Sequence, residues 1–334
     1  MKSEDMILKA AIVHILDSSV GIPVLSDQSM EVGPDFSDFL KAHIEKITES
    51  DDVKHCTFAE GSEVKELLQN CTPDNFVETS KQLAERLYDI MNANIDIPAA
   101  DVAMTVFGCK GKDYLAFLKM NYKTSYTHQT RETDGGNSNE IILQRALLPG
   151  QGQRLSEAFV LDLSDGSLIL AEKKYEVNGE KCFSELFLEC RAPLSQKSKL
   201  DIVTRAVDQV AKKYYGNEDA QKKMEIKDII CNELEEQGEI KVSELREKVF
   251  PGSPEMLEEL DEKLDRYNLS YETVAPKNEQ TIKKFQKQKL YTDTGIEITI
   301  PMEEYRNPDH VEFITNMDGT ISVLIKNIGM LSSK

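Results

Sequence analysis

Closely spaced turn signals separate the β-rich runs of the first 195 residues, and this spacing most constrains the fold. The runs "DVAMTVF" (101–107) and "YLAFLKMNY" (114–122) are joined only by "GCKGKD", which predicts a hairpin. Turn signals at 164–166 (SDG) and 178–179 (NG) divide residues 158–190 in the same way, which predicts a β-meander. Parallel strands need much longer crossovers. The short connections therefore predict an antiparallel sheet and argue against a doubly wound parallel one.

The same region also carries helix and loop signals. "ILKAAIVHIL" (7–16) predicts a strand, followed by a turn over 17–21. Apolar residues between 36 and 47 recur at helical spacing, with Asp35 as the expected cap. The clearest helix spans 73–92, with Thr72 as cap and Pro73 in its first turn. We expect "RETDGGNSNEI" (131–141) to form a loop. Together, these strand and helix signals predict an α+β domain over residues 1–195.

A helical region and a β region are expected after Pro193. Apolar residues from Val203 to Tyr214 repeat at helical spacing, and Gly216 suits a C-cap. Further helices are predicted at about 218–236, 242–249 and 254–267, so residues 196–269 form a helical region. "GIEITIP" and the hairpin "HVEFITNMDGTISVLIKNI" define a small C-terminal β region over 270–334. An open apolar edge there is a liability. We expect it to pack against the α+β region or to be covered in a homodimer.

The predicted helices 242–249 and 254–267, joined through "FPGSP", suggest a helix-turn-helix. A DNA-reading second helix presents bases to the phosphates. This one carries six acids against Lys263 and Arg266, a net charge of −4. We therefore interpret the pair as a packing or partner-binding bundle.

Charge is distributed unevenly along the chain. Of its 40 bases and 59 acids, eight bases and nine acids lie in residues 270–334, which leaves 32 bases and 50 acids in residues 1–269. Repulsion should keep most of the acidic surface away from nucleic acid. Contact with DNA would have to be local, or made through a partner.

One short segment, residues 277–289, runs against this acidic background, and we call it the lysine segment. It holds five lysines against one acid, Glu279. In an extended chain, three of the lysines and the phenylalanine share one side, with Lys284 opposite. Such a strip can follow a phosphate backbone without reading bases, although a solvated linker is the simpler interpretation. The candidate nucleic-acid-binding residues are Lys277, Lys283, Lys284, Phe285, Lys287 and Lys289.

No catalytic, metal-binding or cofactor-binding constellation emerges from the sequence. Asp293-Thr294-Gly295 is the tripeptide of aspartic proteases, but that chemistry needs two carboxylates, so a polar turn is favoured. The loop from Gly150 to Arg154 lacks the spacing of a phosphate-binding motif. His43 falls on an apolar helical stripe and is interpreted as a packing residue.

The six cysteines form no CxxC pair, which indicates reduced thiols in a cytosolic protein. The sequence contains no apolar run long enough for a transmembrane helix, and no membrane association is expected.

Several stretches resemble a known family. They include "LYDIMNANIDIPAADVAMTVF", "LPGQGQRLSEAFVLDLSDGSLILAEKKYEVNGEKCFSELFLEC" and "TIKKFQKQKLYTDTGIEITIPMEEY". Together they are similar to the bacterial 37-kDa nucleoid-associated proteins of the NdpA/YejK type along nearly the whole chain. The matching motifs are turns and packing strands rather than catalytic signatures.

The resemblance implies a non-enzymatic protein of the cytoplasm and nucleoid. It also implies a homodimer, and a link of some members to type II topoisomerase. We therefore expect weak, non-specific DNA binding, binding to a DNA-associated protein, or both. A protein-binding adaptor without DNA contact, and an enzyme using Asp293 or the Gly150–Arg154 loop, remain the alternatives.

Overall fold

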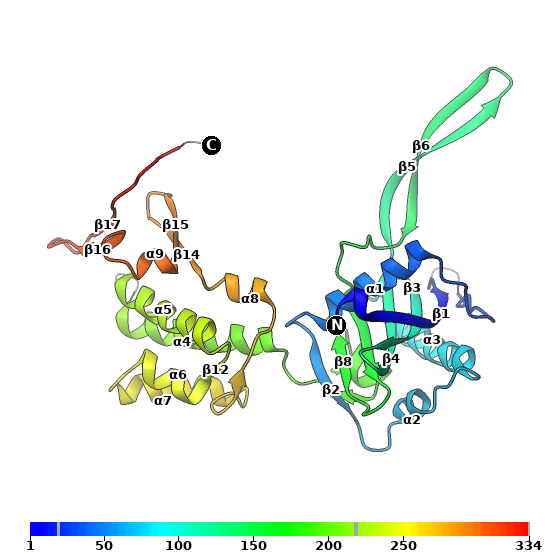
Figure 1. Ribbon diagram of the computed structural model, residues 1–334, viewed down its shortest axis with the longest axis horizontal. Helices are drawn as coiled ribbons and strands as arrows, with labels where there is room; N and C mark the ends of the chain where they lie inside the picture. The colour runs from blue at the N-terminus through cyan, green and yellow to red at the C-terminus, as the bar shows by residue number, and fades with distance from the viewer. Residues whose placement is uncertain (19–20, 217–219, 333–334) are drawn as a thin grey trace. The chain divides into compact units, whose positions relative to one another are not determined.

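The computed structural model describes residues 1–18, 21–216 and 220–332. The chain has an α+β fold and divides into two compact units, Met1–Pro193 and Leu194–Lys334 (Figure 1). This division falls close to the predicted boundary at 195/196. The helical and terminal β segments both belong to the second unit, and the boundary expected at 269/270 stays a prediction.

A seven-stranded sheet forms the centre of the first unit as described. Every pairing in it is antiparallel, as the short connections predicted. The hairpin expected at 101–122 is confirmed, with Lys110 and Gly111 at its turn. The strand order across the sheet is β1 (Met6–Leu16), β3 (Ala100–Cys109), β4 (Lys112–Asn121), β7 (Glu157–Asp162), β8 (Leu168–Ala171), β2 (Lys54–Phe58) and β11 (Cys190–Arg191).

Helices cover both faces of this sheet, so the first unit has two apolar cores. One core lies between the sheet and α1 (Pro34–Thr48), and the other lies beneath α2 (Glu63–Gln69) and α3 (Phe76–Ala93). Alternate residues of β3 enter opposite cores: Met104 faces α3 and Ala103 faces α1. The ring of His43 is buried on α1 beside Phe39, which confirms its packing role. A short helix, η1 (Ser3–Asp5), precedes β1.

Helix starts in the first unit differ from those predicted. Helix α1 follows Gly33, so Asp35 lies in its first turn rather than at the cap. Helix α3 begins only at Phe76, after Thr72 and Pro73. The Oδ1 of Asn75 instead accepts the backbone N–H of Thr72, which forms a separate turn ahead of the helix. The turn expected over 17–21 includes residues outside the described ranges.

The predicted meander is only partly confirmed. Strands β7 and β8 form as expected, and a small hairpin of β9 (Glu176–Val177) and β10 (Glu180–Lys181) turns at Asn178-Gly179. Residues Cys182–Phe187 then form a π-helical segment, η2, rather than a strand. The guanidinium of Arg86 donates to the Phe187 carbonyl at 3.0 Å, so tertiary contacts hold this segment in place.

The predicted loop at 131–141 is wrong. These residues belong to a two-stranded ribbon of β5 (Lys123–Thr133) and β6 (Gly136–Leu147), which projects from the body of the first unit (Figure 1). The ribbon buries neither face in a core. Its strands are therefore mainly polar and lack the apolar alternation from which a strand is predicted. The sequence did offer one signal, the Asp134-Gly135 turn between Thr- and Ile-containing runs.

The second unit is built on a helical core to which small β-hairpins attach. The core comprises α4 (Gln196–Tyr215), α5 (Ala220–Glu236), α6 (Val242–Val249) and α7 (Pro254–Asp265). Gly216 caps α4 at a φ of 71°, and α6 has its predicted bounds. The first two residues of the helix predicted at 218–236 lie outside the described ranges. The smaller elements are β12 (Ile240–Lys241), β13 (Thr273–Val274), α8 (Glu279–Lys283), β14 (Lys287–Tyr291), β15 (Glu297–Pro301), α9 (Met302–Tyr305), β16 (Val311–Thr315) and β17 (Ile321–Ile325).

The terminal hairpins are fixed to α5 by a small apolar cluster and an ion-pair network. Met302 packs with Met224 and Cys231. The guanidinium of Arg306 lies 2.6 Å from a carboxylate oxygen of Asp228 and 2.9 Å from one of Glu235. In the described ranges, no helix is both long and apolar enough to cross a membrane.

Candidate nucleic-acid interface

The lysine segment is not one extended strip. Lys283 ends α8, Lys284 follows it, and Lys287 and Lys289 lie on β14. The predicted arrangement, with Phe285 on the lysine side, is therefore wrong, because a helical turn interrupts the alternation of sides. All five lysines are nonetheless exposed. The ammonium groups of the segment therefore lie at the end of a helix and on a strand, and not along one side of an extended chain.

The pairing of β14 with β15 gives this hairpin two different faces. Lys287 is opposite Pro301 and Lys289 is opposite Thr299, and these residues share the outer face. Leu290 is opposite Ile298 on the other face and packs against the apolar cluster on α5. Packing of this inner face thus orients the two strand lysines outward.

Two of the lysines have acidic neighbours. The Nζ of Lys283 lies 2.8 Å from Glu279, and the Nζ of Lys289 lies 4.0 Å from Glu297. The Lys283 ammonium lowers the pKa of the Glu279 carboxyl. Among the described residues, no carboxylate forms an ion pair with Lys284 or Lys287. Exposed ion pairs of this kind are weak and are screened by salt, so all four ammonium groups can approach a phosphate.

The aromatic residue that accompanies the lysines is not the one expected. Phe285 is half-buried and packs against the helical core. Tyr291 ends β14 on the same face as Lys287 and Lys289, and its side chain is 66% exposed. An exposed ring beside cations can stack on an unpaired base. Strand alternation from Lys287 would have identified Tyr291 once the start of β14 was known.

Basic residues from two helices of the second unit lie together in the structure. Arg205 and Gln209 of α4, together with Lys263 and Arg266 at the end of α7, line a groove of about 170 Å³ beside Tyr267. Lys263 and Arg266 line this groove although the helix predicted there carries a net charge of −4. The same two bases, together with Lys213, also line a neighbouring groove of about 480 Å³ beside Tyr214, which contains Glu255, Glu258, Glu259 and Glu262.

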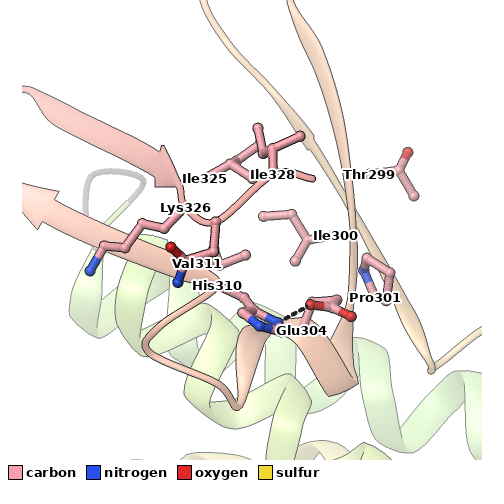
Figure 2. A pocket seen from close by; sticks show the side chains of 10 residues that line it. Thr299, Ile300, Pro301, Glu304, His310, Val311, Ile325, Lys326 and Ile328 are labelled. Carbon is pink, nitrogen blue, oxygen red and sulfur yellow. Dashed lines mark hydrogen bonds and ion pairs between the residues drawn. The ribbon is translucent and has the colours of Figure 1, made fainter. Parts of the chain in front are cut away.

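A third hollow lies behind the lysine hairpin. Figure 2 shows the side chains of Ile300, Val311, Ile325 and Ile328 around a pocket of about 280 Å³. The Nδ1 of His310 lies 2.5 Å from a carboxylate oxygen of Glu304 at its margin. The lining is mainly apolar, so this pocket suits an apolar side chain better than a phosphate.

The residues considered for catalysis lie in a turn and in a loop. Asp293 lies in the turn between β14 and β15, closed by a 3.0 Å hydrogen bond from Thr292 N–H to the Ile296 carbonyl, so the turn interpretation is confirmed. In the Gly150–Arg154 loop, Gly150 N–H donates to the Gln153 side chain, and Arg154 pairs with Asp52 at 2.6 Å. The Gly150 N–H and the Arg154 guanidinium thus both have partners within the chain.

Comparison with known proteins agrees with the resemblance seen in the sequence. No curated protein matches the chain. The family model NA37, described as nucleoid-associated protein YejK, matches residues 12–330 and so includes most of both units. The chain belongs to the NA37 family of nucleoid-associated proteins.

Proposed function

We propose that this protein is a non-catalytic component of the bacterial cytoplasmic nucleoid that binds DNA weakly through its lysine segment. One observation carries the proposal: five exposed lysines lie within thirteen residues of a chain whose net charge is −19. Lysines contact phosphates as point charges, and contacts to phosphate carry no sequence information. The binding is therefore independent of DNA sequence and sensitive to salt.

The acidic remainder of the chain limits the strength of this contact. Each phosphate neutralised on duplex DNA contributes about 0.9 to the slope of log affinity against log salt concentration. A few lysines opposed by a large negative charge give measurable binding only at low ionic strength. The same charge favours basic protein surfaces as partners.

The test is a variant in which Lys283, Lys284, Lys287 and Lys289 are changed to glutamine. We expect similar losses of affinity for unrelated DNA sequences and a shallower salt dependence. A matched variant carries the same charge change in the first unit, at Lys65, Lys110, Lys173 and Lys174, all of which are exposed. Equal affinity and slope in the lysine-segment variant and the wild type, both folded, would refute direct contact.

A second candidate function is that of an adaptor which reaches DNA only through another protein, for which type II topoisomerase is the expected partner. The groove beside Tyr214 supports it, because its four glutamates outnumber its three bases, Lys213, Lys263 and Arg266, and so favour a basic segment. Nucleoid localisation that requires the partner, without DNA binding by the purified protein, would favour this function.

An enzymatic function has its own test. Purified protein would be incubated with unfolded protein substrates and with nucleotides. Turnover that disappears in Asp293→Ala or Arg154→Ala would overturn the non-catalytic proposal.

The proposed form of the protein in solution is a homodimer, as the resemblance implies. Light scattering at micromolar concentration tests this directly, and a stable monomer would refute it.

A further inference from the structure

The β5–β6 ribbon has no partner within the described chain. The two strands pair only with each other, and none of the apolar clusters includes Tyr126, Ile141 or Leu143. In Figure 1 the ribbon extends well beyond the sheet and helices of the first unit. An isolated two-stranded hairpin is marginally stable in water. A ribbon of this length is therefore expected to gain stability from a further contact.

The strand register divides the ribbon into two unlike faces. Residues directly opposite each other share a face, and Tyr126 is opposite Leu143 while His128 is opposite Ile141. Tyr126 and Ile141 are 72% and 71% exposed. We call these four residues the ribbon's apolar face.

The opposite face is mostly polar. It carries Gln129, paired with Glu140, and Arg131, whose guanidinium lies 3.4 Å from Glu140. Ile142, opposite Thr127, is its one large apolar residue and is half-buried. An apolar side and a polar side on a solvent-exposed ribbon indicate that one side is covered by a partner.

We propose that the apolar face is a self-association surface, on which the same face of a second copy's ribbon packs. Two ribbons stacked in this way give a four-stranded, two-layer structure with a shared apolar interior, which is what a single ribbon lacks. The inference rests on the proposed homodimer, and it assigns the surface that forms it. It does not depend on DNA contact by the lysine segment.

Charge favours a second copy over other occupants. Residues 123–147 hold three bases (Lys123, Arg131, Arg145) and three acids (Glu132, Asp134, Glu140), so the ribbon is neutral. Two chains that each carry −19 repel over most of their surfaces, and a neutral projecting arm lets them meet away from the acidic bodies. A neutral arm also lacks the excess of cations that binding to a phosphate backbone requires.

The first test compares self-association of three full-length proteins by sedimentation. The face variant carries Tyr126→Thr and Ile141→Thr, which keep a high β propensity while removing apolar area. The control carries Gln129→Thr and Ser138→Thr on the opposite face. We expect a wild-type dimer at about 10 µM, a dissociation constant at least roughly tenfold higher in the face variant, and no change in the control.

Thiol crosslinking provides a test that does not depend on weakening the ribbon. Stacked sheets lie about 10 Å apart, so a bismaleimide of roughly that span should join two copies that carry His128→Cys. The same crosslinker should not join copies that carry Gln129→Cys on the opposite face. Wild-type protein supplies the baseline, since five of its cysteines are buried and Cys71 is half-buried.

The possible failures can be told apart. A wild-type dimer that persists unchanged in the face variant would overturn the assignment of the ribbon and leave the homodimer standing. A wild type that is monomeric throughout would overturn both. If that monomer loses DNA affinity in the face variant, the occupant is nucleic acid and the inference is wrong.

Discussion

The Nζ of Lys119 lies 3.2 Å from the Oε2 of Glu157, between directly paired residues of β4 and β7 at the centre of the antiparallel sheet. Both side chains are buried. The Nδ2 of Asn121 donates to the same carboxylate oxygen at 3.0 Å, and Lys119 also donates to the Pro98 carbonyl at 3.3 Å. Burial lowers the pKa of Lys119. The pair is an internal ionic contact in an otherwise apolar layer.

Breaking this pair from one side should destabilise the first unit strongly. Lys119→Met leaves the Glu157 carboxylate buried without its cation, at a cost of about 3–5 kcal/mol in the free energy of unfolding. Combining it with Glu157→Leu removes the unpaired buried charge and should recover most of the lost free energy of unfolding. Urea denaturation followed by circular dichroism measures both. A double variant no more stable than Lys119→Met would contradict this account.

Acid should destabilise the first unit through its two buried histidines. Burial lowers the pKa values of His14 and His43 from 6.5 to about 4. Above pH 6.5 each is neutral in both states, and its full contribution to stability is present. Between pH 6.5 and 4 the unfolded chain binds protons that the folded chain does not, so stability is lost as the pH falls. The loss reaches up to about 3 kcal/mol for each residue.

The variant His43→Leu removes the contribution of His43 to this pH dependence and leaves that of His14. Within the described ranges the ring nitrogens of His43 make no hydrogen bond of normal geometry, so leucine removes the titration without breaking one. Unfolding free energies measured at several pH values between 7 and 4 should decrease less steeply in the variant. An unchanged slope would show that His43 does not titrate in this range.

Removing the acids beside the lysine segment should strengthen DNA binding. Glu279→Gln and Glu297→Gln free Lys283 and Lys289 from their partners and reduce repulsion of phosphate. We expect roughly two- to fivefold tighter binding at low salt, because exposed ion pairs are individually weak. Fluorescence anisotropy with labelled duplex DNA measures the change. Weaker binding would indicate that these acids position the lysines.

Phe285 and Tyr291 should respond differently to truncation. Phe285→Ala removes a ring that packs on the helical core, so we expect a stability loss of about 1–3 kcal/mol with little effect on binding by the folded fraction. Tyr291→Ala should leave stability unchanged and weaken binding to single-stranded DNA, for which stacking contributes about 1–3 kcal/mol per base. The opposite pattern would restore Phe285 as the binding residue.

The sequence determined those elements whose signals are local. The short turn between β3 and β4 permits only an antiparallel pairing, and strong apolar periodicity sets the bounds of α6. Gly216 ends α4 because it adopts a positive φ without steric cost. The position of the lysine segment and the exposure of its lysines likewise followed from composition, because clustered ammonium groups stay in water.

Tertiary structure alone decided which side chains share a surface. The core beneath Phe285 turns its ring inward, and the register of β14 with β15 places Tyr291 beside Lys287 and Lys289 instead. Packing of α7 on α4 brings Arg205 into one groove with Lys263 and Arg266, which are far from it in the sequence. The β5–β6 ribbon escaped prediction because its strands bury neither face in a core, so they carry no full apolar alternation. Side-chain contacts between distant segments decide these features, and local sequence patterns do not encode them.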